Sequence, residues 1–72
     1  PKPLTRTTGN AVLAEFKRLG VDAAEVDAWL PALGIPVSLA QLSQPDAEEL
    51  LGVLRGLDRD RLAELGREAG AR

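Results

Sequence analysis

Apolar residues recur at intervals of three and four in four segments of this 72-residue chain, and each segment is bounded by residues that start or stop helices. This spacing is typical of one face of an α-helix. No window alternates apolar and polar residues as a half-buried strand does, and no segment repeats at a fixed period. The pattern predicts an all-α fold, a compact bundle of three main helices plus a short C-terminal helix.

The first predicted helix ends at Gly20, a residue suited to the left-handed position that follows a helix. We expect Thr7 or Thr8 to cap its start, because a side-chain hydroxyl can accept a hydrogen bond from a free backbone N–H there. Its apolar stripe consists of Val12, Phe16 and Leu19, with Leu13 beside them.

The second predicted helix has the clearest start signal in the sequence. Asp22 is placed as its N-cap and Glu25 as the partner in a capping box, while Val21 and Val26 have the spacing of a hydrophobic staple. Pro31 follows shortly, so we expect this helix to end near residue 30.

The region from residue 35 to residue 57 is expected to hold an extended segment, a short turn and the third helix. Residues 35–37 surround a proline and should be extended, and residues 38–42 should form one turn. Ser43 is the expected cap of the third helix, and Gly52 within it hints at the close approach of another backbone. The apolar stripe of this helix is Ala47, Leu50, Leu51 and Leu54.

Asp58 is the expected cap of a fourth helix, whose narrow apolar edge is formed by Leu62, Leu65 and Ala69. Gly66 and Gly70 suggest that this helix frays toward its end.

The size and composition of the chain limit it to one small domain without chemistry of its own. It contains no Cys, His or Tyr, so the usual general bases, soft nucleophiles and zinc ligands are missing, and we expect neither catalysis nor a bound cofactor or metal. No apolar run is long enough to span a bilayer, which favours a cytoplasmic, soluble domain.

The start of the chain resembles a linker. Residues 1–7 contain two prolines and two threonines, so we expect a flexible lead-in followed by a single helical domain over residues 8–72. Because the chain also lacks Met, we expect it to be part of a longer protein.

The middle of the chain is uniformly acidic. Residues 21–54 carry six carboxylates and no Lys or Arg. Clustered positive charge is what binds a phosphate backbone, so this stretch favours another protein with a basic surface as the partner. The predicted partner-binding residues are Asp22, Glu25, Asp27, Asp46, Glu48 and Glu49.

Two hypotheses of nucleic-acid binding remain as alternatives to a protein partner. The basic lead-in and first helix offer Lys2, Arg6, Lys17 and Arg18 to a phosphate backbone. The apolar spacing from residue 16 to residue 29 also matches a helix-turn-helix motif, although residues 22–33 contain no Arg, Lys, Asn or Gln to read base edges.

Residues 8–57 resemble a small helical module. The resemblance lies in Lys-Arg-Leu-Gly-Val at residues 17–21, an Asp-capped second helix with Trp29, and Val-Ser-Leu-Ala-Gln-Leu-Ser at residues 37–43 leading into the third helix. This module is found at the C-terminal ends of phage-type single-strand-annealing proteins of the RecT and Erf kind and in phage Mu-like regulators. Pro31 and Pro36 depart from its usual uninterrupted second helix. The resemblance implies a non-catalytic accessory domain in DNA recombination or replication, acting on a partner protein or on single-stranded DNA through the parent protein.

Large side chains are scarce, and this affects two further expectations. Trp29 is one of two aromatic residues, and we expect it in the core rather than as a stacking platform for a base. A core this thin could also be completed across a symmetric interface, so self-association through Leu39, Leu42 or Leu57 is a further hypothesis.

Overall fold

The computed structural model describes residues 3–70 and confirms the all-α class. Within this part of the chain there are four α-helices and three short 3-10 turns, but no strand. The helices are α1 (Arg6–Arg18), α2 (Val26–Trp29), α3 (Gln44–Arg55) and α4 (Arg59–Gly70), and the 3-10 turns are Ala23–Glu25, Leu30–Leu33 and Leu39–Gln41.

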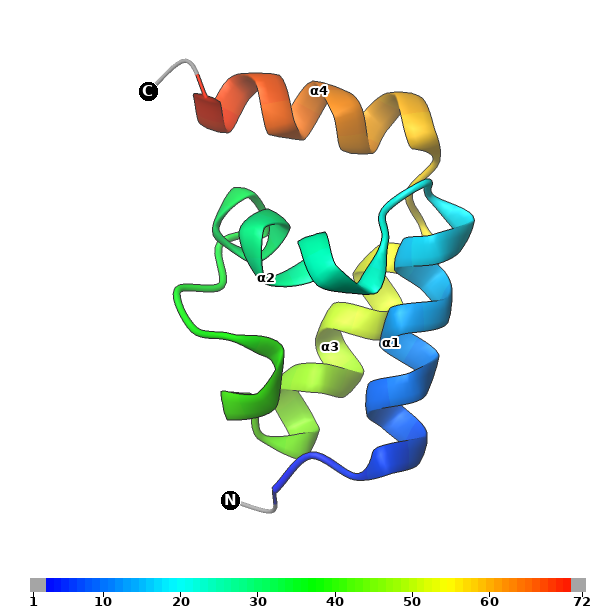
Figure 1. Cartoon of the computed structure of the whole chain (residues 1–72), viewed down its shortest axis with the longest axis vertical. Helices are drawn as coiled ribbons and strands as arrows, with labels where there is room; N and C mark the ends of the chain where they lie inside the picture. The colour runs from blue at the N-terminus through cyan, green and yellow to red at the C-terminus, as the bar shows by residue number, and fades with distance from the viewer. Residues whose placement is uncertain (1–2, 71–72) are drawn as a thin grey trace.

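Helices α1 and α3 lie side by side and run in the same direction (Figure 1). Hydrogen bonds join them at both ends. Near their amino ends, Gln44 Nε2 donates to Thr8 Oγ1 at 2.7 Å. At their carboxyl ends, the Arg18 guanidinium donates to the backbone oxygen of Leu54 at 2.9 Å. Parallel neighbouring helices cannot be joined by a tight turn. Residues 19–43 therefore form a long connection that runs back along the pair, and α2 lies within it.

The core is apolar throughout, and no buried polar residue lies among the described residues. Phe16, Leu30 and Leu54 have no exposed surface and come from three different elements. All of the predicted stripe residues of the first and third helices are therefore buried or pack against the core, as expected. The buried set is Val12, Phe16, Leu19, Val21, Val26, Leu30, Leu42, Ala47, Leu50, Leu54 and Leu62.

Several expected helix boundaries are confirmed. Ser43 caps α3 by accepting a hydrogen bond from the backbone N–H of Asp46 at 3.4 Å. Asp58 caps α4 by accepting from the N–H of Arg61 at 2.7 Å. Gly20 follows α1 with φ of 87°, a left-handed conformation that glycine adopts without a steric penalty. These signals are local, which is why the sequence alone predicts them.

The start of the first helix was predicted two or three residues too late. Thr5, rather than Thr7 or Thr8, is the cap, and its hydroxyl accepts from the N–H of Thr8 at 3.2 Å. The side chain of Gln44 holds this end in place by accepting from the N–H of Thr5 at 3.0 Å. Leu4 packs against the core, and Pro3 pairs with Ser43 in an isolated bridge. The position of the cap thus depends on a contact with α3.

The second helix differs most from its prediction. The α-helical part has only four residues, and a 3-10 turn precedes and follows it. Asp22 makes no side-chain cap hydrogen bond, so the predicted capping box with Glu25 is wrong. The two valines of the predicted staple, Val21 and Val26, are buried as that motif requires. Burial of these side chains therefore fixes the entry of the chain into this region.

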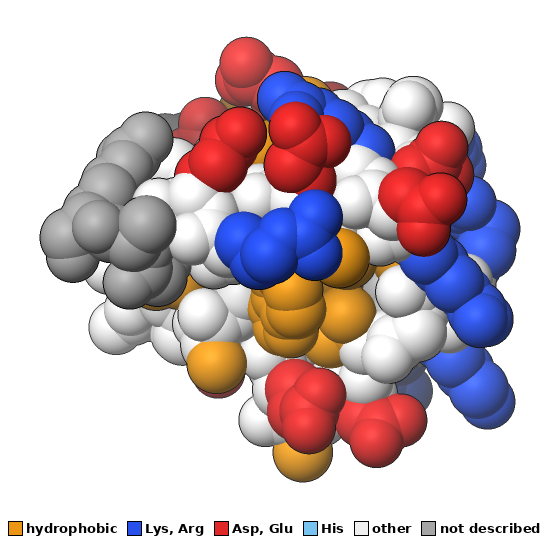
Figure 2. Space-filling view, turned by 90° about the horizontal axis from the view of Figure 1, so that it is seen from above, with side chains coloured by type: hydrophobic (Ala, Val, Ile, Leu, Met, Phe, Trp, Pro, Cys, Tyr) orange, Lys and Arg blue, Asp and Glu red, His pale blue; other side chains and the backbone are white. Residues whose placement is uncertain are grey.

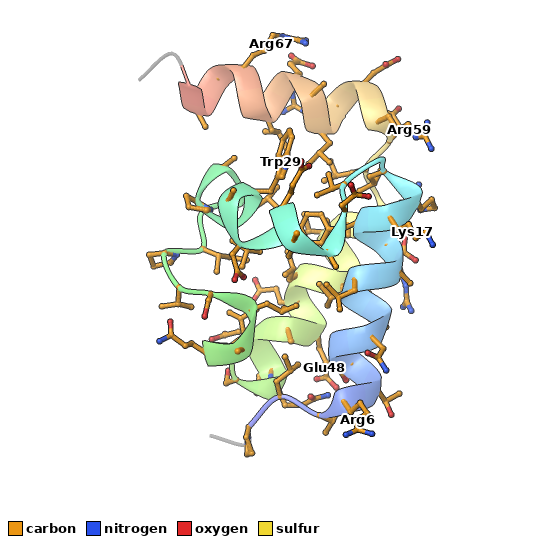
Figure 3. All side chains as sticks on the ribbon, in the orientation of Figure 1. Arg6, Lys17, Trp29, Glu48, Arg59 and Arg67 are labelled. Carbon is orange, nitrogen blue, oxygen red and sulfur yellow. The ribbon has the colours of Figure 1, made fainter. Side chains whose placement is uncertain are left out.

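The C-terminal helix is as long as α3, at 12 residues, and it packs across one end of the bundle (Figure 1). Leu62 of this helix is buried in the core, with 2% of its surface exposed. Trp29 points from α2 toward this helix and is partly buried, in agreement with its expected place at the core (Figure 3). The helix meets the indole ring at Gly66.

Gly52 and Gly66 have roles opposite to those expected. A Cβ placed on Gly66 would lie 2.7 Å from Cη2 and Cζ3 of Trp29, whereas one placed on Gly52 would have no atom within 4 Å. Close approach therefore occurs at Gly66, and the hint that Gly52 allows it is wrong.

We predict opposite effects of Gly66→Ala and Gly52→Ala on stability. Alanine favours a helix over glycine by up to about 1 kcal/mol, so Gly52→Ala should raise the free energy of unfolding. Gly66→Ala should lower it by about 1 kcal/mol, because the new methyl group displaces the indole ring. Urea unfolding followed by circular dichroism measures both. Equal stabilisation by the two substitutions would show that α4 does not pack on Trp29.

Candidate functional site

An apolar groove lies between α3 and the extended segment that follows the 3-10 turn Leu30–Leu33. It encloses about 470 Å³. Its floor includes the buried side chains of Leu42 and Leu50. At its rim are Val37 and Val53, which are 39% and 50% exposed and are the exposed large hydrophobic residues of the described chain. Single exposed apolar residues are common on protein surfaces, but these two valines flank one continuous hollow.

One face of α3 forms the first wall of this groove. Asp46, Glu49, Leu50 and Val53 all line it, at the spacing i, i+3, i+4 and i+7 that places residues on one side of a helix. The carboxylates come first along the helix and the apolar side chains follow. On this wall the two carboxylates therefore lie nearer the amino end of α3 than Val53 does.

The opposite wall is held at both ends by hydrogen bonds. Gly34 adopts a left-handed φ of 83° and reverses the chain, and the N–H of Ile35 donates to the backbone oxygen of Leu30 at 3.0 Å. Beyond the wall, the N–H of Leu39 donates to Asp27 Oδ1 at 2.9 Å. The predicted one-turn element follows directly, with the N–H of Ser38 donating to Gln41 Oε1 at 3.3 Å. These contacts form the groove within the folded chain itself.

The six predicted partner-binding acids do not share one surface. Asp46 and Glu49 line the groove. Asp27 is bound to the backbone of Leu39, and Glu48 accepts from Gln44 Nε2 at 3.2 Å near the amino ends of α1 and α3 (Figure 3). The remaining two, Asp22 and Glu25, lie exposed at the two ends of the first 3-10 turn.

The predicted nucleic-acid-binding residues are also dispersed. Arg6 and Lys17 lie at opposite ends of α1 (Figure 3). Arg18 donates to Glu15 Oε1 at 2.9 Å and to backbone oxygens of Leu54 and Leu57. Lys2 lies outside the described residues. On the face that carries α4, acidic and basic side chains both surround a small apolar patch, with Lys and Arg gathered along one edge (Figure 2).

Arginines cap the adjoining carboxyl ends of α1 and α3. The negative ends of two helix dipoles meet there, an arrangement that favours nearby cations. At the carboxyl end of α3, the Arg18 guanidinium donates to the backbone oxygens of Leu54 and Leu57, at 2.9 and 3.1 Å. At the carboxyl end of α1, Arg59 Nε donates to the backbone oxygen of Arg18 at 3.1 Å. These two side chains thus hold the fold together at this end.

We predict that Arg18→Ala lowers the free energy of unfolding by about 1 kcal/mol, because two carbonyl groups lose a charged donor. The neighbouring Lys17→Ala is the matched control and should change it by less than about 0.5 kcal/mol. Thermal and urea unfolding of the three proteins test this. A loss of equal size in both variants would indicate a general charge effect rather than a cap.

The groove cannot be recognised from the sequence pattern alone. The pattern predicts an extended segment at residues 35–37 but indicates no role for it, and it does not single out Val53. One signal was present, because Val53 falls outside the apolar stripe of its helix and is therefore an apolar residue on the wet face. Only the path of the 34–38 segment shows that a hollow lies beside it.

Comparisons of the chain with protein-family models, with curated proteins and with solved structures find no match. Across residues 3–70, no helix is long and apolar enough to cross a membrane. The same residues bring together no group of three or more side chains of the types that hold metal ions.

Proposed function

We propose that this chain is a non-catalytic protein-interaction module that binds a segment of another protein in the groove beside α3. The observation that carries this proposal is the pair of exposed valines, Val37 and Val53, on either side of a hollow with a buried apolar floor. The hollow has a volume in the range of binding pockets. An apolar side chain placed there would remove both valines from water, which favours binding.

The fixed walls of the groove support the same proposal. Gly34 and the Asp27 to Leu39 hydrogen bond hold the extended segment away from α3 in the free chain. A preformed site loses less conformational entropy when it binds than a flexible one does.

The biological setting is a second part of the proposal and has a different basis. The resemblance of residues 8–57 to the helical module of phage-type annealing proteins favours an accessory role in DNA recombination or replication. In that setting the partner is another protein with a basic surface, and any single-stranded DNA is bound through the parent protein.

Direct nucleic-acid binding is less well supported. Its candidate cations Arg6 and Lys17 lie at the two ends of a 13-residue helix, and Arg18 is engaged in capping. On the face that carries α4, Lys and Arg lie along one edge, but acidic side chains occur on the same face (Figure 2). Phosphate binding draws on positive charges that are clustered.

Selection from a displayed library of random 16-residue peptides tests the interaction function. We expect peptides that bind the folded domain and that shift the backbone NMR signals of residues 33–37 and of α3. Val53→Gln removes the apolar rim at a half-exposed position and should weaken their binding at least tenfold. Because glutamine is a good helix former, the variant should remain folded.

Ala23→Gln, at an exposed position in the first 3-10 turn, is the matched control and should bind as the unmodified chain does. Two results would overturn the proposal. One is a selection that yields no binder above background, and the other is a set of binders whose NMR shifts lie outside the groove and that tolerate Val53→Gln.

A further inference from the structure

The groove carries negative charge that nothing in the described chain neutralises. Among residues 3–70, the carboxylates of Asp46 and Glu49 form no ion pair and accept no side-chain or backbone hydrogen bond. No Lys or Arg lines the groove, and none occurs from residue 21 to residue 54. A ligand in the groove therefore meets a negative field from one side.

The order of the lining residues gives the ligand a direction. Glu49 and Val53 are four residues apart on α3, and Asp46 and Val53 are seven apart. At 1.5 Å per residue, the backbone positions of Glu49 and Asp46 lie about 6 and about 10.5 Å along the helix axis from that of Val53. The aliphatic stem of a lysine or arginine can lie along apolar surface while its charged head reaches such a carboxylate.

We infer that the occupant of the groove is a partner segment that carries an apolar side chain beside one or two lysines or arginines. This inference rests on the proposed function and names the chemistry of its partner. The apolar residue packs between Val37 and Val53 over Leu50, and the cations pair with Asp46 and Glu49. Basic segments are thereby bound, while acidic ones are repelled at the same site.

A second copy of this chain fits the groove poorly. In a two-fold dimer the same patch faces itself, so Asp46 and Glu49 would meet the same two carboxylates of the other copy. No cation lines the patch to compensate for them. Charge complementarity therefore favours a different, basic protein over self-association at this surface.

Charge reversal in the groove tests this inference with defined probes. We use three fluorescent 12-residue peptides, built from Leu and Lys, from Leu and Glu, and from Ser and Lys. The unmodified domain should bind the Leu and Lys peptide at least tenfold more tightly than either of the others. The affinity of the domain for the Leu and Lys peptide should fall as the salt concentration rises, because salt screens the ion pairs at the exposed rim. In Asp46→Lys with Glu49→Lys, the preference should switch to the Leu and Glu peptide.

Asp22→Lys with Glu25→Lys is the matched control. In the control as in the groove variant, an exposed acid near the start of a helical turn is followed three residues later by a second exposed acid. The two double substitutions change the net charge by the same amount. The control should keep the original preference, and circular dichroism should show that both variants are folded. A control that switches preference as the groove variant does would overturn the inference, because net charge alone would then explain the result.

The library selection separates this inference from the proposed function. If selected peptides bind the groove but carry no excess of lysine and arginine, the partner chemistry is wrong and the interaction function stands. If no peptide binds there, both fail. Concentration-dependent sedimentation that is abolished by Val53→Gln would instead assign the groove to a second copy and would also overturn the inference.

Discussion

The parallel contact between α1 and α3 is the constraint on which the rest of the structure depends. It brings Phe16 and Leu54, both fully buried, into one core and places like ends of two helix dipoles together. Gln44 joins the amino ends, and Arg18 offsets the negative charge at the carboxyl ends. With no Cys or His in its sequence, a chain of this size depends on such packing and capping.

The groove follows from this parallel arrangement. Two parallel neighbours require a long connection, and residues 19–43 must cover the length of the pair while contributing Leu30 and Leu42 to the core. Gly34 turns the chain away between these two contacts, so the wall at residues 34–38 stands off from α3. The connection between the two helices thus also forms one wall of an apolar groove that is open to solvent.

The contact of α4 with Trp29 shows where reasoning from local pattern reaches its limit. Glycine in a helix ordinarily signals weakness, and both Gly52 and Gly66 satisfy that description in the sequence. Only Gly66 lies against the indole ring, because α4 crosses the bundle at that point. The same limit applies to the acidic residues. Their excess in residues 21–54 is evident from the sequence. In the structure, Asp46 and Glu49 line the groove, whereas the other four acids are hydrogen-bonded elsewhere or lie at the exposed ends of the first 3-10 turn.

The all-α class, most of the buried apolar residues and the helix ends at Ser43, Asp58 and Gly20 can be predicted from the amino-acid sequence, because they depend on spacing and on contacts within one turn. Three features follow only from the folded arrangement: α1 begins after Thr5, its neighbour α3 is parallel to it, and the segment at residues 34–38 forms a groove with the face of α3. Each of these features joins residues far apart in the chain, through contacts such as that of Thr5 with Gln44. Local propensity carries no information about such contacts, since they exist only once the core has formed.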